Sequence, residues 1–322
     1  MILVTGGAGF IGSQVVAALC AMGEECVLVQ RSRSEPPPRF AGMPVQLVRG
    51  DVNDLETFLA IGEHAAITGI VHLAGSMPWP PVRENAVESA RRSLGSFFNL
   101  VSAAQRWNVP RVVTASTIGV YGGIEHGGAL REDEPVPLGH LHVIPTFKKI
   151  AELLGGYLAS MTDVEIVQAR ISGTWGPGGH LPDPFFPASA LVAAAARGIK
   201  PDLSGLLVPP RAGDGLDLSY VKDTGRAIAL LQLADRLEHD VYNVGSGHAT
   251  TNADVVDAIR TVVPGFEVDL PEGSAEPLRW LDISRLRQNT GYQSQYDTAA
   301  AAEDYIRWFR DGGAEGEKRA HL

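Results

Sequence analysis

The chain has 322 residues, enough for two domains or for one large α/β domain with a sizeable hydrophobic core. Hydrophobic residues make up 45% of the sequence and charged residues 20%, which excludes a disordered or fibrous protein. The formal net charge of -10 argues against nucleic acid or an anionic membrane surface as a binding partner. With only Cys20 and Cys26, no apolar run long enough to span a bilayer and no signal-like N-terminus, we expect a soluble cytoplasmic protein.

The start of the chain predicts a β-strand, a glycine-rich turn, a helix and a second strand. In that order, these elements are expected at residues 2–5, 6–12, 11–22 and 26–30. Within the turn, Gly6, Gly9 and Gly12 form a G-x-x-G-x-x-G pattern. Glycine lets the backbone turn sharply and approach a pyrophosphate, and the free N–H groups of a helix N-terminus attract its charge. We therefore predict a dinucleotide-binding turn; the alternative is a glycine-rich turn without a ligand.

The end of the second predicted strand indicates which dinucleotide binds. An NAD-preferring site usually has Asp or Glu there, to bind the ribose 2′-hydroxyl. This chain has Gln30 and Arg31 instead, followed by Arg33, and guanidinium groups can bind a 2′-phosphate. We predict NADP(H), with NAD still possible. The alternative is that both arginines are solvated loop residues.

Strand-like and helical segments alternate through the first half of the chain. Further strands are predicted at residues 45–48, 70–73, 111–116 and 164–170, and helices at residues 54–64, 87–107 and 145–161. This alternation predicts a parallel sheet with helices on both faces, which is a Rossmann-type doubly wound α/β fold.

The composition changes after Arg170. Residues 173–187 are rich in glycine, proline and aromatic residues and are expected to form a loop, and helices are predicted at residues 224–233, 252–263 and 299–310. We predict an NAD(P)-binding Rossmann domain at residues 1–170, with residues 217–247 returning to it, and a smaller irregular substrate-binding lobe at residues 171–216 and 248–322. Ligands of open α/β sheets bind at the carboxyl ends of the strands, so the cleft between the lobes is the predicted site.

Short motifs along nearly the whole chain resemble those of one family. They are Thr5-Gly6-Gly7-Ala8-Gly9-Phe10-Ile11-Gly12, Gly50-Asp51-Val52, Val71-His72-Leu73-Ala74-Gly75, Ala115-Ser116-Thr117, Val120-Tyr121-Gly122, Trp175-Gly176-Pro177 and Tyr220-Val221-Lys222-Asp223. In this order the chain resembles the extended short-chain dehydrogenases/reductases of the NAD-dependent epimerase/dehydratase family.

The resemblance implies a set of cofactor contacts, with the adenine beside the loop at residues 51–52 and the phosphates and ribose beside residues 73–75. The cofactor-binding residues that it implies are Phe10, Ile11, Asp51, Val52, Leu73, Ala74, Gly75, Ala115, Ser116, Lys148 and Ile171. The strand ending Gln30-Arg31 is similar to that of the family's NADP-using reductases of the dihydroflavonol type. By the same resemblance, the helices predicted at residues 87–107 and 145–161 would form a homodimer through a helix bundle.

The catalytic positions of the family are only partly retained. The family uses a Ser or Thr, a Tyr that exchanges a proton, and a Lys four residues after the Tyr, which lowers the pKa of the Tyr and holds the ribose. Thr117 and Lys148 fit the first and last of these positions, but Ile144 stands at the position of the Tyr. Shifting the register to Lys149 places Pro145 there, which also cannot exchange a proton.

Another group must therefore exchange the proton if hydride chemistry occurs. His142 lies two residues before Ile144 and carries an imidazole that can titrate near neutral pH, so we predict it as a catalytic residue. His140 and Tyr121 are further candidates. For each of the three, the alternative is a loop or packing role.

The substrate positions also differ from those of the nucleotide-sugar members of the family. Leu216 occupies the position of an arginine that pairs with substrate phosphate, and Gly173 that of an asparagine. A more apolar pocket is expected, formed by Trp79, Trp175, Phe185 and Phe186, unless these aromatic residues pack between the lobes. Arg92, at another asparagine position of the family, could hold a carboxylate or phosphate.

The leading hypothesis is an NADP(H)-binding oxidoreductase that acts on a carbonyl or alcohol of a small molecule other than a nucleotide. Thr117 would polarise the oxygen, Lys148 would hold the ribose, and His142 or water would exchange the proton. A regulator that binds the cofactor without chemistry, and a non-redox isomerase or lyase, are the alternatives. No metal site is predicted.

Overall fold

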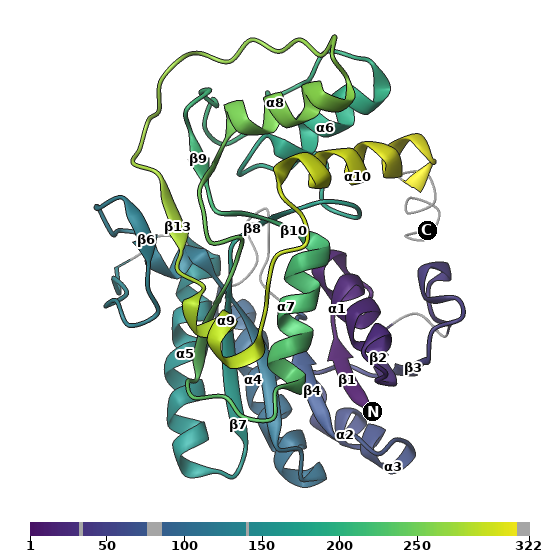
Figure 1. The fold of residues 1–322 in the computed structure, drawn as a ribbon. Helices are drawn as coiled ribbons and strands as arrows, with labels where there is room; N and C mark the ends of the chain where they lie inside the picture. The colour runs from purple at the N-terminus through teal and green to yellow at the C-terminus, as the bar shows by residue number, and fades with distance from the viewer. Residues whose placement is uncertain (32–34, 76–85, 140–141, 314–322) are drawn as a thin grey trace.

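The computed structural model describes residues 1–31, 35–75, 86–139 and 142–313 (Figure 1). The strands are β1 (Ile2–Thr5), β2 (Cys26–Gln30), β3 (Val45–Arg49), β4 (Gly69–His72), β5 (Arg111–Thr117), β6 (Gly128–Leu130), β7 (Glu165–Ile171), β8 (Gly173–Trp175), β9 (Gly215–Leu216), β10 (Leu218–Tyr220), β11 (Val241–Val244), β12 (Thr250–Thr251) and β13 (Arg279–Leu281). The α-helices are α1 (Phe10–Ala21), α2 (Leu55–Leu59), α3 (Ile61–His64), α4 (Ala86–Trp107), α5 (Val143–Met161), α6 (Ala188–Arg197), α7 (Val221–Leu233), α8 (Asn252–Val262), α9 (Ser284–Thr290) and α10 (Thr298–Arg310). Two 3-10 helices, η1 (Pro38–Phe40) and η2 (Ile118–Tyr121), complete the set.

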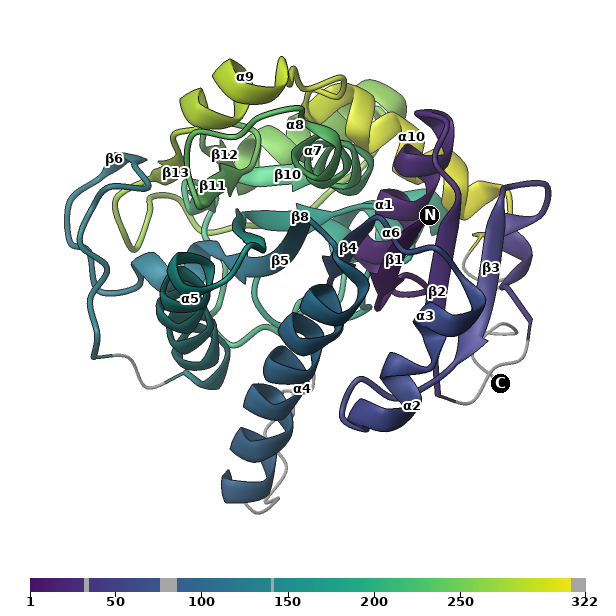
Figure 2. The same ribbon diagram turned by 90° about the horizontal axis from the view of Figure 1, so that it is seen from below.

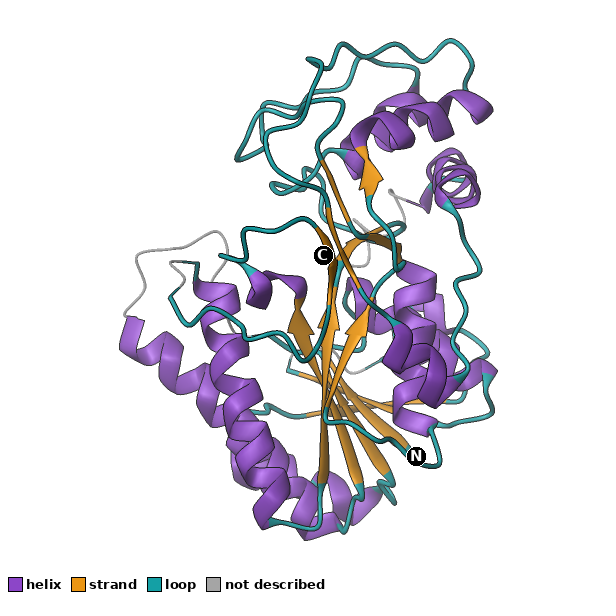
Figure 3. Ribbon diagram, turned by 60° about the vertical axis from the view of Figure 1, so that its left-hand side comes forward, coloured by secondary structure: helices purple, strands orange, loops and turns teal. Residues whose placement is uncertain are grey.

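A seven-stranded sheet with the order β11-β7-β5-β4-β1-β2-β3 forms the centre of the molecule, and all its strand pairs are parallel (Figure 3). The first strand lies between β2 and β4, with Ile2 opposite Cys26 on one side and Gly69 on the other. The chain therefore winds outward from β1 in both directions. This confirms the predicted Rossmann-type doubly wound fold.

Helices cover both faces of the sheet because its strands alternate their side chains between two cores. Ile2 and Val4 belong to a core that includes Leu19 of α1, whereas Leu3 between them belongs to a core that includes Leu100 of α4. Figure 2 shows α1 and α7 on one side of the sheet and α4 and α5 on the other. The carboxyl ends of all strands consequently meet at one edge.

The second half of the chain contributes both to the sheet and to a smaller lobe. Strand β11 pairs with β7, and α7 packs against α1, so residues 221–244 lie with the sheet. The smaller lobe has its own core, in which α6, α8 and α10 surround Trp175. Trp175 is 1% exposed, and its ring lies 6.4 Å from that of Tyr305. The domain boundaries at 170, 216 and 247 stay a prediction.

Two local predictions differ from the structure. The helix predicted at residues 54–64 is two short helices, α2 and α3, because the indole nitrogen of Trp107 donates to the carbonyl of Leu59 (3.3 Å). This carbonyl would otherwise accept the bond that continues the helix, and the amide of Glu63 bonds instead to Ala60. The loop predicted at residues 173–187 begins with the strand β8, which pairs with β10 much further along the chain. Across the described parts of the chain, no helix has the length and apolar character needed to cross a membrane.

Candidate functional site

The glycine-rich turn between β1 and α1 is held against the end of β4. Gly6 has a φ of +70°, and a Cβ on it would lie 2.8 Å from the amide nitrogen of Ala74. A Cβ on Gly12 would lie 2.1 Å from the carbonyl oxygen of Gly6, so both positions require glycine. Helix α1 begins after Gly9, which has no side chain to cap it, and its first amides face the end of the turn. The turn thus presents N–H donors of the kind that bind phosphate.

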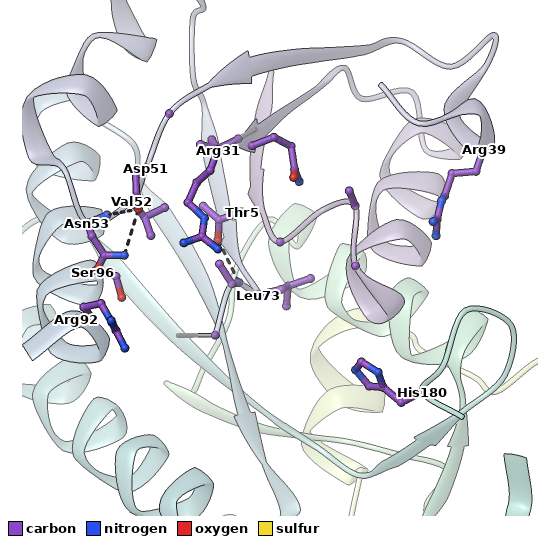
Figure 4. A pocket seen from close by; sticks show the side chains of 18 residues that line it. Thr5, Arg31, Arg39, Asp51, Val52, Asn53, Leu73, Arg92, Ser96 and His180 are labelled. Carbon is purple, nitrogen blue, oxygen red and sulfur yellow. Dashed lines mark hydrogen bonds between the residues drawn. The ribbon is translucent and has the colours of Figure 1, made fainter. Parts of the chain in front are cut away.

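A cavity of about 840 Å³ lies in front of this turn, at the carboxyl ends of β1, β2, β3 and β4 (Figure 4). The structure brings together nine residues that the sequence predicts for the cofactor, namely Gly6, Gly9, Gln30, Arg31, Asp51, Val52, Leu73, Ala74 and Gly75. A cavity of this size can hold a dinucleotide, and its backbone and side chains fit one.

Most of the charged side chains that line this cavity are basic. Arg31 reaches into the cavity from the end of β2, Arg39 lies on η1, and Arg92 projects from α4, whereas Asp51 is the one carboxylate among the described lining residues. Asp51 is also engaged, because its Oδ1 accepts hydrogen bonds from the backbone and side chain of Asn53. The cavity is therefore suited to an anionic ligand.

The sequence did not predict four of the polar lining side chains, which are Arg39, Asn53, Ser96 and His180. Each lies outside the motifs on which the prediction rests. Ser96 stands one helical turn after Arg92, so α4 periodicity relates these two positions. Arg39 and His180 reach the cavity only through tertiary structure.

Some predicted cofactor residues do not line this cavity. They are Phe10, Ile11, Gly12, Ala115, Ser116, Lys148 and Ile171. Gly12 is instead in contact with Gly6, and Ile171 is buried at the end of β7. Arg33, Trp79 and His140, which the sequence also singles out, lie outside the described residues.

Lys148 lies in a smaller cavity of about 40 Å³ that adjoins the first one. Ala74 and Gly75 line both cavities, and Ala115 lines the smaller one. Lys149 points elsewhere, because its ammonium group donates to the carbonyl of Pro137. The structure thus selects Lys148 rather than Lys149 as the lysine at the inner end of the dinucleotide cavity.

The surroundings of Lys148 disfavour its charge. Burial lowers the pKa of Lys148 to about 8, although the negative charge of Glu152 acts in the opposite direction. Burial and the charge of Lys148 together lower the pKa of His72 to about 3, so this histidine is neutral. Its Nδ1 lies 2.7 Å from the hydroxyl oxygen of Thr5. Lys148 is therefore a group that can gain or lose a proton near neutral pH.

Glu152 belongs to a buried polar network beneath the site. The guanidinium of Arg170 donates to both of its carboxylate oxygens, with Nη2 to Oε2 at 2.8 Å, and Ser116 donates to Oε1. Arg170 also donates to the hydroxyl of Tyr121, which donates to Asn243 (2.8 Å). Burial raises the pKa of Tyr121 to about 12. The hydroxyl of Tyr121 is thus held between Arg170 and Asn243, which favours a packing role for this residue over proton exchange.

The remaining predicted catalytic positions lie around the start of α5. The hydroxyl oxygen of Thr117 accepts a bond from the amide of Gly119 (3.1 Å), so its own proton can point outward. His142 is the N-cap of α5, where its Nδ1 accepts a bond from the amide of Ile144 (3.3 Å). The ring of His142 lies 6.0 Å from that of Phe185. The imidazole of His142 is therefore in contact with both the first turn of α5 and the ring of Phe185.

The predicted substrate positions form an apolar contact rather than a polar anchor. A Cβ on Gly173 would lie 2.7 Å from the Cδ1 of Leu216, so the leucine occupies the space beside the glycine. Of the aromatic residues expected in the pocket, Trp175 is buried in the lobe core and Phe186 packs against that core. Phe185 is 50% exposed. The prediction that Trp175 and Phe186 line an apolar pocket is thus wrong, because both pack in the core of the smaller lobe.

A further cavity of about 700 Å³ adjoins η2 and β9, and Leu216 and Gly119 are among its lining residues. The described charged side chains that line it are Glu125, Glu276 and Arg279. Arg279 is bound to Glu276 (2.9 Å) and donates to the carbonyls of His126 and Glu125. Arg279, the one cation among the described residues that line this cavity, is therefore already paired and does not match a polyanionic ligand. In the described part of the chain, no group of three or more His, Cys, Asp and Glu side chains is arranged to hold a metal ion.

The sequence and the fold agree with one family. Residues 2–245 match the profile of the NAD dependent epimerase/dehydratase family. The chain belongs to this family. Its match covers the whole central sheet, from β1 to β11, and therefore includes the glycine-rich turn and the dinucleotide cavity.

Relatives in the family span nearly the full chain. The chain is 30% identical over 305 residues to dTDP-6-deoxy-L-talose 4-dehydrogenase (NAD(P)(+)) of Kitasatospora kifunensis, with 90% of each chain covered. It is 25% identical over 317 residues to UDP-glucose 4-epimerase of Lacticaseibacillus casei, with 92% of each chain covered. Its fold is similar to that of dTDP-glucose 4,6-dehydratase from Bacillus anthracis in complex with NAD, with a TM-score of 0.80, 19% identity and 99% of each chain covered.

Proposed function

We propose that this protein binds NADP(H) and transfers hydride between the cofactor and a carbonyl or alcohol of a small molecule other than a nucleotide sugar. The observation that carries the proposal is the position of Arg31 in the dinucleotide cavity, at the strand end that selects between NAD and NADP. Arg39 lines the same cavity and supplies a second guanidinium for a 2′-phosphate. The solved relative with NAD and the relative that uses NAD(P)(+) support a nicotinamide cofactor.

The residues of this chain take distinct roles in the proposed reaction. The free amides at the start of α1 hold the diphosphate, and Lys148 holds the nicotinamide ribose. The bound nicotinamide would supply the hydride chemistry. The hydroxyl oxygen of Thr117 accepts a bond from the amide of Gly119, which leaves the hydroxyl proton to be donated to the substrate oxygen.

The proton must come from a group other than the usual tyrosine. Ile144 cannot exchange a proton, and His142 stays the predicted substitute, with water as the other source. The Nδ1 of His142 is bound to the start of α5, so Nε2 is the nitrogen that would exchange the proton. Without such a substitute, loss of the tyrosine would slow the reaction by about 10² to 10⁴ relative to members that retain it.

The substrate is proposed to lack a nucleotide diphosphate, although relatives are named for UDP- and dTDP-sugars. Leu216 and Gly173 contact each other where the family's nucleotide-sugar members have polar anchors. Arg279, the described cation of the adjoining cavity, is bound to Glu276. A diphosphate there would lose its hydration without gaining a matched partner, which costs free energy.

The protein is also proposed to be a homodimer in the cytoplasm. The large apolar residues exposed on two neighbouring helices include Phe98 on α4, and Leu153 and Tyr157 on α5. Leu153 and Tyr157 are four residues apart and so share one face of α5. Pairing of this face with a second copy would bury all three side chains in a helix bundle.

Calorimetric titration with NADPH and NADH, followed by a hydride-transfer assay, tests the proposal. We expect NADPH to bind at least tenfold more tightly, Arg31→Ala to remove this preference, and turnover on some member of a panel of aldehydes, ketones and alcohols. Tighter binding of NADH that is unaffected by Arg31→Ala would overturn the cofactor assignment. Tight NADPH binding without turnover would favour a regulator, and turnover without change in the nicotinamide would favour an isomerase or lyase.

A further inference from the structure

His180 lines the dinucleotide cavity from the opposite lobe. All other described lining residues lie between Thr5 and Ser96, in the half of the chain that builds the start of the sheet. His180 follows β8 and precedes α6 of the smaller lobe, and Figure 4 shows its ring at the cavity. A dinucleotide in this cavity would therefore touch both lobes.

The loop that carries His180 is braced on both sides of the histidine. Before it, the amide of Gly179 bonds to the carbonyl of Gly176 (3.2 Å). After it, a carboxylate oxygen of Asp183 accepts from the amide of Phe185 (2.8 Å), and the carbonyl of Pro184 accepts from Leu207 (2.9 Å). These bonds fix the backbone, so the imidazole is presented from a defined position.

The loop also rests on the start of α1. A Cβ on Gly179 would lie 3.3 Å from the ring of Phe10, the first residue of α1, so glycine allows the loop to approach the helix closely. The N-terminus of this helix is where a βαβ unit binds the diphosphate of a dinucleotide. His180, next in the chain after Gly179, consequently stands beside that position rather than beside the adenine.

The other basic residues of the cavity lie elsewhere. Arg31 and Arg39 follow β2, on the side of the 2′-phosphate, and Arg92 lies beside the loop of Asp51. We propose that His180 donates a hydrogen bond to the diphosphate of the dinucleotide and so positions the smaller lobe over it. The imidazole has an N–H donor in both its neutral and its charged form. The inference rests on the proposed binding of NADP(H).

The test compares NADPH with adenosine 2′-monophosphate, which shares the 2′-phosphate but lacks the diphosphate and the nicotinamide riboside. Calorimetry would measure the Kd of NADPH and of adenosine 2′-monophosphate for the wild type, His180→Ala, His180→Gln and Arg31→Ala. We expect His180→Ala to raise the Kd of NADPH about tenfold, as for loss of one hydrogen bond to a charged group, and to leave that of adenosine 2′-monophosphate unchanged. His180→Gln keeps an N–H donor and should recover most of the affinity.

Arg31→Ala should give a different pattern: it should weaken the binding of both ligands, because both carry the 2′-phosphate. His64→Ala, which changes a histidine on α3 outside the lining of the cavity, is the matched control and should bind both ligands like the wild type. His180 is exposed, so its variants should keep the wild-type melting temperature.

Three outcomes would overturn the inference. If His180→Ala binds NADPH as the wild type does, the histidine does not contact the cofactor, and the proposed function stands without it. If His180→Ala weakens adenosine 2′-monophosphate as much as NADPH, the histidine does not act at the diphosphate. If the wild type binds no NADPH, the proposed function fails together with the inference.

Discussion

Leu216 fills the space beside Gly173, because its Cδ1 lies 2.7 Å from the point where a Cβ on the glycine would stand. We expect Gly173→Ala to lower the free energy of unfolding by about 1–3 kcal/mol through overpacking. In a Leu216→Ala background, the same change should cost at least about 0.5 kcal/mol less. Urea unfolding of the wild type and of the three variants of this cycle measures the coupling. Additive effects would show that the two side chains do not compete for space.

The buried ion pair between Glu152 and Arg170 should be important for stability. Both side chains are less than a tenth exposed, so Glu152→Gln leaves a buried guanidinium without its counter-charge. We expect a loss of about 3–5 kcal/mol in the free energy of unfolding, measured in urea. Glu303→Gln breaks an exposed pair with Arg307 and should cost less than about 0.5 kcal/mol. Similar losses for both variants would contradict this account.

Lys148 should make stability depend on pH in the alkaline range. Its pKa of about 8 in the folded chain lies below the ordinary 10.5, so the unfolded chain binds more protons between these values. The free energy of unfolding should therefore rise with pH from about 8 to 10.5. Lys148→Met should remove this rise and stabilise the protein at pH 7 by roughly 1–3 kcal/mol. Denaturant unfolding at several pH values measures both effects.

The exposed Lys200 provides the control for this titration. Lys200→Met should keep the wild-type rise. An unchanged rise in Lys148→Met would show that another group is responsible.

Introducing a tyrosine at Ile144 should test the proposed loss of the catalytic tyrosine directly. Ile144→Tyr places a phenol four residues before Lys148, whose charge can lower its pKa. For a carbonyl that the wild type reduces, we expect kcat to rise by about 10² to 10⁴ if water supplies the proton in the wild type, and by less if His142 already supplies it. Ile144→Phe supplies the ring without the hydroxyl and should not accelerate the reaction. Equal rates in the two variants would mean that the phenol has no role.

The apolar face of α4 and α5 should govern the oligomeric state. Light scattering of the wild type should give twice the chain mass of 34.3 kDa. Phe98→Asp combined with Tyr157→Asp should give the mass of one chain, because buried carboxylates would face each other in the bundle. Leu207→Asp changes an exposed apolar residue of the smaller lobe and should leave the dimer intact. A wild-type monomer would refute the proposed homodimer.

The fold could be predicted largely because its signals are local. The run Ile2–Thr5, the spacing of Gly6, Gly9 and Gly12, and the apolar face of α1 occur within one short segment. Such patterns depend on backbone sterics and on helical and strand periodicity, which act between near neighbours. The same reasoning failed at residues 54–64, where Trp107 captures the carbonyl of Leu59 from a distant part of the chain.

The site was predicted only in part for the same reason. Gln30, Arg31 and the segment at residues 73–75 lie at strand ends, which a parallel sheet brings to one edge, and the structure places them in one cavity. Arg39 and His180 carry no local signal, because one follows a proline-rich turn and the other lies in a loop of the second lobe.

The sequence by itself determined the sheet, the glycine-rich turn and the presence of Ile144, rather than a tyrosine, four residues before Lys148, since each follows from residues close together in the chain. Tertiary structure alone decided that Tyr121 is bound by Arg170 and Asn243, that Trp175 completes a lobe core, and that His180 faces the cavity. These contacts join residues far apart in the chain, and their partners are set by packing of whole elements rather than by local pattern.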